Sequence, residues 1–122
     1  MIAFTRTIPI LRSFDEAKAK EFYLDFLGFK VDFEHRFEPD LPLYMGISRD
    51  GLTLHISEHF GDALPGAALY LEMTGLRDFH AELLGKKYRF ARPGIGPGHD
   101  GGICVNITDP FGNKLRFNER DA

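Results

Sequence analysis

Five histidines and one cysteine are the side chains of this sequence most able to bind a metal ion or to transfer a proton. His80 lies in a predicted helix, and His99 lies in a glycine-rich run. His35 and His59 flank predicted strands, and His55 lies within one. No serine, histidine and aspartate stand in an order that indicates a nucleophilic triad. The histidines alone therefore do not identify an active site.

Cys104 is the only cysteine, so the chain cannot form an internal disulfide. That excludes a secreted scaffold held together by disulfides. Because Cys104 sits in the strand-like run Ile103–Val105, we expect a buried, unreactive thiol and not a nucleophile.

The glycine-rich run Pro93–Gly102 has the composition of a phosphate-binding loop but lacks its Gly-Lys-Ser/Thr ending. A phosphate-binding loop is followed by a helix, and no clear helix follows this run. We therefore expect a loop that closes over a binding groove and carries His99.

A chain of 122 residues with 43% hydrophobic and 27% charged residues has the size and composition of one globular domain. The net charge of −3 argues against a nucleic-acid partner, which normally needs a basic surface. No apolar run approaches the roughly 20 residues that span a bilayer, so no membrane partner is expected. Residues Met1–Arg6 show no signal peptide, and we expect a cytoplasmic protein.

Hydrophobic periodicity and turn residues predict the elements that position these side chains. A strand over Ile8–Leu11 is followed by a helix over Ser13–Leu27, capped by Ser13 or Asp15 and ended by Gly28. Further strands are predicted over Phe29–Phe37, Leu43–Ser48, Leu52–Ser57, Ala67–Met73, Lys87–Ala91, Gly102–Thr108 and Lys114–Asn118, with a helix over Leu76–Leu84 that Gly85 ends. A hairpin turn at Arg49–Gly51 joins two of them, with Gly51 at positive φ.

The second half of the chain repeats the first. Matching residues of the two halves are separated by one constant number of positions before a loop and by another constant number after it. The matched residues are Phe22 with Phe79, Gly28 with Gly85, Phe33 with Phe90, and, after that loop, Gly51 with Gly112. This repeat predicts an α+β fold of two β-α-β-β-β modules, about residues 1–58 and 67–119, within one domain over residues 1–122.

Two segments resemble the glyoxalase, bleomycin resistance and dioxygenase superfamily, also called the vicinal oxygen chelate superfamily. The run EFYLDFLGF at Glu21–Phe29 is similar to its first-helix motif, and DPFGN at Asp109–Asn113 is similar to its turn before the last strand. The resemblance covers nearly the whole chain and implies a curved mixed sheet. Chain size and Pro9 in the first strand resemble the bleomycin resistance branch, in which this proline accompanies an N-terminal arm exchanged between subunits. The resemblance thus implies an arm-exchanged homodimer with a ligand groove shared between chains.

Catalytic members of the superfamily hold a divalent metal through His or Glu on the first and last strands of each module. The resemblance places these positions at Thr7 or Ile8, at His55, at Ala67 or Ala68, and at Arg116. Only His55 can ligate, and the permanent charge of Arg116 repels a metal. We therefore expect no metal, no cofactor and no catalytic residues. The alternative is a lyase, isomerase or dioxygenase with a rearranged metal site that uses His55, Glu58 or His99.

The function that the resemblance implies is metal-free sequestration of a bleomycin-type antibiotic. Phe33 matches an aromatic that lines the drug groove in the resistance branch, and Phe37 offers a second flat apolar surface. The other expected ligand-binding residues are His55, Ser57, Glu58, His99 and Arg116. Glu34 and Glu38 would favour a cationic group of the ligand. An unknown small metabolite as ligand is a further alternative, which the sequence does not separate from an antibiotic.

Overall fold

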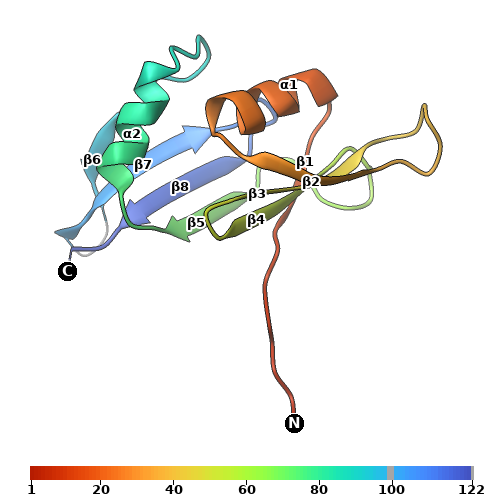
Figure 1. The fold of residues 1–122 in the computed structure, drawn as a ribbon, viewed down its shortest axis with the longest axis horizontal. Helices are drawn as coiled ribbons and strands as arrows, with labels where there is room; N and C mark the ends of the chain where they lie inside the picture. The colour runs from red at the N-terminus through yellow and green to blue at the C-terminus, as the bar shows by residue number, and fades with distance from the viewer. Residues whose placement is uncertain (99–100, 122) are drawn as a thin grey trace. The chain divides into compact units, whose positions relative to one another are not determined.

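The computed structural model describes residues 1–98 and 101–121, and the chain divides into two compact units, Met1–Pro65 and Gly66–Ala122. Unit 1 contains β1 (Ile10–Arg12), α1 (Glu16–Lys20), η1 (Glu21–Phe26), β2 (Lys30–His35), β3 (Tyr44–Arg49) and β4 (Leu52–Ser57) (Figure 1). Unit 2 contains β5 (Ala68–Glu72), α2 (Leu76–Gly85), β6 (Ile95–Pro97), β7 (Ile103–Thr108) and β8 (Lys114–Glu119). The predicted α+β fold of two β-α-β-β-β modules is confirmed. Among the described residues, no helix is long and apolar enough to cross a membrane.

The two sheets have the same topology. The strand order is β1-β4-β3-β2 in unit 1 and β5-β8-β7-β6 in unit 2. In each sheet the first strand pairs parallel to the last strand, and the remaining neighbours are antiparallel. Asp50 and Gly51 close the β3–β4 hairpin at φ values of 46° and 94°, as a type I′ turn requires. Asp50 thus shares the left-handed conformation that the sequence assigned to Gly51 alone.

The helical segment of unit 1 begins at Glu16, three residues later than predicted, and Asp15 is its N-cap. The Asp15 side chain accepts a hydrogen bond from the Lys18 backbone nitrogen at 3.0 Å. The second half, η1, is a π-helix, and at its end the Leu27 nitrogen donates to the Phe22 oxygen five residues back. Gly28 ends the segment at a φ of 77°, as the sequence predicts.

One face of the unit 1 sheet forms the core of this unit with the helical segment. The core side chains alternate along β3 and β4 and pair across the ladder, Met45 with Ile56 and Ile47 with Leu54. Phe22, Tyr23 and Phe26 of η1 are equally buried. Phe29, which follows this segment, is buried as well. The alternation leaves every second side chain of the strands on the opposite, helix-free face.

The predicted strand over Lys87–Ala91 is wrong, whereas the second helix ends at Gly85, within one residue of its predicted end. The C-cap is Lys86, and the residue that takes the left-handed conformation is Lys87, at a φ of 54°. After the helix the chain turns instead of entering a strand.

Part of the glycine-rich run forms the edge strand β6 and does not form a loop. Ile95, Gly96 and Pro97 pair with β7, and Pro97 on an edge strand costs the sheet no hydrogen bond. The Gly98 nitrogen donates to the Gly102 oxygen at 2.7 Å. His99 lies outside the described residues. Cys104 is half-buried, not buried as expected, and its Sγ donates to the Pro97 oxygen at 3.4 Å.

Candidate functional site

The helix-free face of the unit 1 sheet carries a row of side chains from three adjacent strands. Strand register places Phe33 of β2 opposite Gly46 of β3, and Gly46 opposite His55 of β4. Tyr44 lies two residues before Gly46 on the same strand and therefore shares this face. Phe33, Tyr44 and His55 form a group of rings that we call the aromatic platform.

The three rings of the platform contact one another. The Phe33 ring lies nearly parallel to that of Tyr44, with centroids 6.2 Å apart and planes at 15°. It meets the His55 ring edge to face at 5.2 Å. A hydrogen bond of 2.7 Å joins the Tyr44 hydroxyl to His55 Nδ1. Each ring is therefore held by the other two, which fixes the orientation of the platform.

Gly46 gives the Phe33 ring its place on the sheet. A Cβ atom at Gly46 would lie 2.3 Å from Phe33 Cε1, so any other residue would displace the ring. Phe33 itself remains 43% exposed. One side of the ring thus rests on the glycine backbone, and the exposed part is open to a ligand.

Tyr44 keeps its proton near neutral pH. Burial raises the pKa of the Tyr44 phenol above its ordinary value, and the negative charge of Asp62 adds to the rise. A protonated hydroxyl can donate to His55 Nδ1, which leaves the other ring nitrogen of His55 as the N–H of the neutral tautomer. The platform can therefore offer a ligand an exposed ring surface for stacking and, in addition, a hydrogen-bond donor.

A second aromatic contact group lies at and beyond the end of β2. The ring of Phe37 contacts those of His35 and His59 edge to face, with centroids 4.8 and 5.9 Å apart. Phe37 is 72% exposed. Both predicted stacking residues, Phe33 and Phe37, are thus exposed aromatics of unit 1, but they belong to different contact groups.

Ser57 is fully buried and holds a turn of the backbone. Its hydroxyl donates to Asp62 at 2.6 Å and accepts from the His59 nitrogen at 3.0 Å. Glu58 accepts a hydrogen bond from the Leu43 nitrogen at 3.0 Å. Neither residue contacts the platform through any of these bonds.

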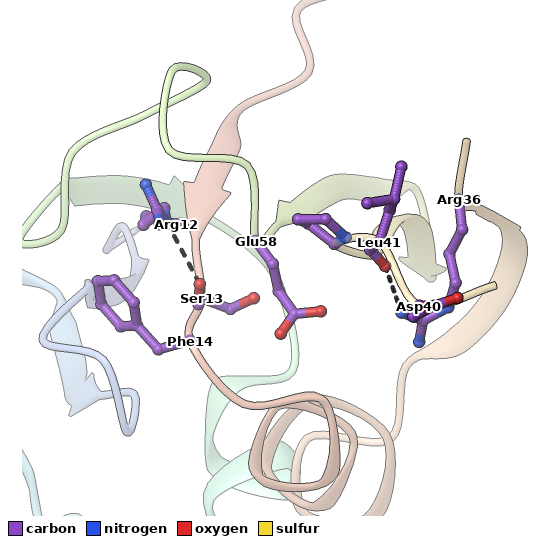
Figure 2. Close-up of a pocket in the computed structure, with 8 residues that line it drawn as sticks. Arg12, Ser13, Phe14, Arg36, Asp40, Leu41 and Glu58 are labelled. Atoms are coloured by element: carbon purple, nitrogen blue, oxygen red, sulfur yellow. Dashed lines mark hydrogen bonds between the residues drawn. The ribbon is translucent and has the colours of Figure 1, made fainter. Parts of the chain in front are cut away.

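Glu58 instead points into a separate pocket of unit 1, with a volume of roughly 340 Å³ (Figure 2). The pocket is lined by Arg12, Ser13, Phe14, Arg36, Asp40, Leu41, Pro42 and Glu58. Arg36 forms an ion pair with Glu16 and donates to the Leu41 oxygen at 2.9 Å. The Arg12 guanidinium lies against the rings of Phe14 and Phe60, 4.9 and 5.7 Å from their centroids. The platform contributes no residue to this lining.

Glu34, which was expected to favour a cationic group of the ligand, lies on the opposite face of β2 from Phe33. Glu34 pairs in register with the buried Met45, on the side of the helical segment, and forms an ion pair with Lys20 at 2.8 Å. The hydrogen bond between Lys20 and Glu34 raises the pKa of Lys20, and the hydrogen bond between Lys20 and Glu16 raises it to a smaller extent. Successive residues of a strand face opposite ways, which separates Glu34 from Phe33.

Arg116 and Pro9 are not among the platform residues. Arg116 is an exposed residue of β8, opposite Tyr70 on β5 and Asn106 on β7. Pro9 accepts a backbone hydrogen bond from the His55 nitrogen at 2.9 Å and so lies just before the β1–β4 pairing. Residues 1–7 before it are exposed and form no helix or strand.

The donor set does not fit the metal site of catalytic relatives. Ile10 of β1 lies directly opposite His55, and Tyr70 of β5 lies directly opposite Arg116. Each is two or more positions along the chain from the metal-ligand position that the resemblance implied for that strand. Nδ1 of His55 is engaged by Tyr44. Within residues 1–98 and 101–121, no three His, Cys, Asp or Glu side chains lie close enough together to hold a metal ion.

Protein purified without chelator should therefore contain well under one equivalent of Ni, Zn, Fe or Mn per chain, because one histidine does not satisfy a divalent metal. Elemental analysis by mass spectrometry measures this, with His55→Ala as the matched variant. A tightly held equivalent in the parent protein that His55→Ala loses would contradict the prediction and support a rearranged metal site.

Comparison with known proteins agrees with the fold. A family model described as glyoxalase superfamily protein matches residues 1–122. No curated protein sequence matches the chain significantly.

Three of the most similar solved structures are antibiotic-binding or resistance proteins. TnmS3, an antibiotic binding protein from Streptomyces sp. CB03234, is 20% identical over 99% of this chain and 100% of its own, with a TM-score of 0.75. A bleomycin resistance determinant encoded on the transposon Tn5 is 21% identical over 98% and 100%, with a TM-score of 0.75. A bleomycin-binding protein from Streptomyces verticillus, solved with copper(II)-bleomycin, is 26% identical over 99% and 100%, with a TM-score of 0.73.

The first two of these likenesses establish the fold alone, since their sequence identity is low. The family match spans every residue of the chain, and both modules of the family fold are present in the order that the sequence repeat predicted. The chain therefore belongs to the glyoxalase superfamily.

Proposed function

We propose that this protein binds a planar aromatic small molecule on the aromatic platform and releases it unchanged. One observation carries the proposal: the exposed Phe33 ring lies over Gly46 and is held by Tyr44 and His55. A ring fixed in this way has lost its conformational freedom before a ligand arrives, so stacking costs less entropy. Binding needs no metal and no catalytic residue.

A bleomycin-type antibiotic is the ligand that we propose first. Support comes from the family and from two structural relatives whose names state that they bind bleomycin, of which one is 26% identical to this chain. Bleomycin carries planar heteroaromatic rings, which suit the exposed face of Phe33. Phe37, Glu58, His99 and Arg116 are proposed as further contacts, and Ser57 as a support for the turn that follows β4.

The proposal predicts that isothermal titration calorimetry with metal-free bleomycin gives saturable heat at a hundred micromolar or less, and that mass spectrometry recovers the drug unaltered. Heat without any change of mass supports binding alone. A changed drug mass would contradict sequestration and favour an enzyme. No heat and no shift in the melting temperature would remove bleomycin as the ligand while leaving the fold unaffected.

We also propose that the protein is a homodimer in which residues 1–9 of each chain pack on the other copy. Ile2 and Phe4 are almost fully exposed in the single chain, although both are large apolar residues. Light scattering should therefore give about twice 13.8 kDa at micromolar concentration. A chain lacking residues 1–7 should be mostly monomeric in the same measurement. A monomer in the full-length protein would contradict the prediction.

A further inference from the structure

The helix-free face of unit 2 carries two cations on one strand. Lys114 and Arg116 of β8 are exposed. The residues that alternate with them, Leu115 and Phe117, are buried on the side of α2. Two residues along a strand span about 7 Å, so the two charges lie near each other on one face. We call this pair the cationic strip.

The described ladder neighbours of the cationic strip do not neutralise it. Its neighbours across the ladder on β5 and β7 are uncharged: Ala68, Tyr70, Asn106 and Thr108. The next residue of β5 on this face, Glu72, forms an ion pair with Arg120 at 2.5 Å. In the part of the chain that the structure describes, no carboxylate pairs with Lys114 or Arg116. The strip thus places two positive charges side by side in a chain whose net charge is −3.

The fold does not require these charges, as the other unit demonstrates. The strand of unit 1 with the same place in the sheet is β4, and its matching residues are Thr53 and His55. Both sheets have the same strand order and pairing, yet the unit 1 face is aromatic and the unit 2 face is cationic. The shared topology therefore does not dictate the charge of this face.

We infer that the cationic strip is a binding site for a small molecule bearing an oxyanion, either a phosphate or sulfate group or a carboxylate. The Arg116 guanidinium can donate two parallel hydrogen bonds to such a group, and Lys114 adds a second charge. Tyr70, Asn106 and Thr108 stand in register beside the two cations and carry hydroxyl and amide donors. This inference shares Arg116 with the further contacts proposed above. Every residue of the aromatic platform belongs to unit 1, so the oxyanion titration can fail while stacking on the platform holds.

The test uses the full chain and titrates it separately with inorganic phosphate, sulfate and acetate at constant ionic strength, with chloride as the reference ion. Two-dimensional NMR of labelled amides follows the residues that respond. The variants are Arg116→Gln and Lys114→Gln, and the matched control is Arg77→Gln, an exposed arginine of α2 in the same unit. All three side chains are exposed, so the variants should keep the parent melting temperature.

The inference predicts saturable shifts at the amides of Tyr70, Asn106 and Arg116 with at least one oxyanion and none with chloride. Arg116→Gln should weaken this binding about tenfold, and Lys114→Gln should weaken it measurably, because each removes a charged donor. Response to phosphate and sulfate assigns a tetrahedral group, and response to acetate alone assigns a carboxylate. The inference is overturned if no oxyanion gives saturable shifts, or if Arg77→Gln weakens binding as much as Arg116→Gln does.

Discussion

Replacing Asp109 with alanine should lower the free energy of unfolding by about 3 kcal/mol, since it leaves several buried donors without acceptors. Asp109 is 4% exposed, and one of its carboxylate oxygens accepts from the backbone nitrogens of Phe111 and Asn113, each at 2.8 Å. The other oxygen accepts from the Asn113 side-chain amide at 2.8 Å. This network holds the turn that enters β8, where Gly112 has a φ of 92°.

Chemical denaturation followed by circular dichroism measures the loss, with Asp121→Ala as an exposed control that should change stability little. If Asp109→Ala does not fold, Asp109→Asn gives the same test in milder form. Asparagine keeps one acceptor oxygen but brings its amide against that of Asn113, so we expect a smaller loss. Parent-like stability in both variants would show that the turn does not depend on the buried carboxylate.

Replacing Phe33 with alanine should weaken the binding of a bleomycin-type ligand about tenfold or more, as for a central aromatic contact. The ring is the exposed member of the platform, and its removal would also take away one ring contact from each of Tyr44 and His55. Phe33 lies on the surface of the sheet, so the melting temperature should change little. Calorimetric titration of the parent and the variant measures the ratio of the two dissociation constants.

Two further variants separate stacking from a general effect on the fold. Gly46→Ala keeps Phe33 but forces its ring off the sheet, and it should weaken binding although no ligand contact is removed. Phe90→Ala removes an exposed phenylalanine at the repeat-matched position of unit 2 and should leave binding unchanged. If Phe33→Ala and Gly46→Ala both bind as the parent does, the ligand does not stack on the platform. Equal losses in Phe90→Ala would point to a nonspecific effect.

The repeat and the turns of this fold could be read from the sequence because each depends on local chemistry. Glycines mark backbone positions with positive φ, as at Gly28 and Gly112, and apolar residues alternate along the strands of both units. Where several residues compete, the sequence is a poorer guide. The left-handed residue after α2 is Lys87 and not Gly85, although a glycine takes this conformation more readily.

The candidate site could be predicted only in part. Phe33 and His55 were identified through family resemblance, but Tyr44 and Gly46 were missed. The signal was present: Met45 and Ile47 are apolar and alternate with Tyr44, Gly46 and Ser48, which predicts one shared face. What no local pattern gives is register, and register alone places Gly46 beneath the Phe33 ring and Ile10 opposite His55.

The most direct test of the central claim is to map bound bleomycin on the protein by NMR, using the metal-free drug and amide shifts assigned residue by residue. If the platform is the binding site, the largest shifts will occur at Phe33, Tyr44, Gly46 and His55, which lie together on the helix-free face of the unit 1 sheet. Saturable shifts confined to the pocket around Arg12, Asp40 and Glu58, with the platform amides unmoved, would contradict the account.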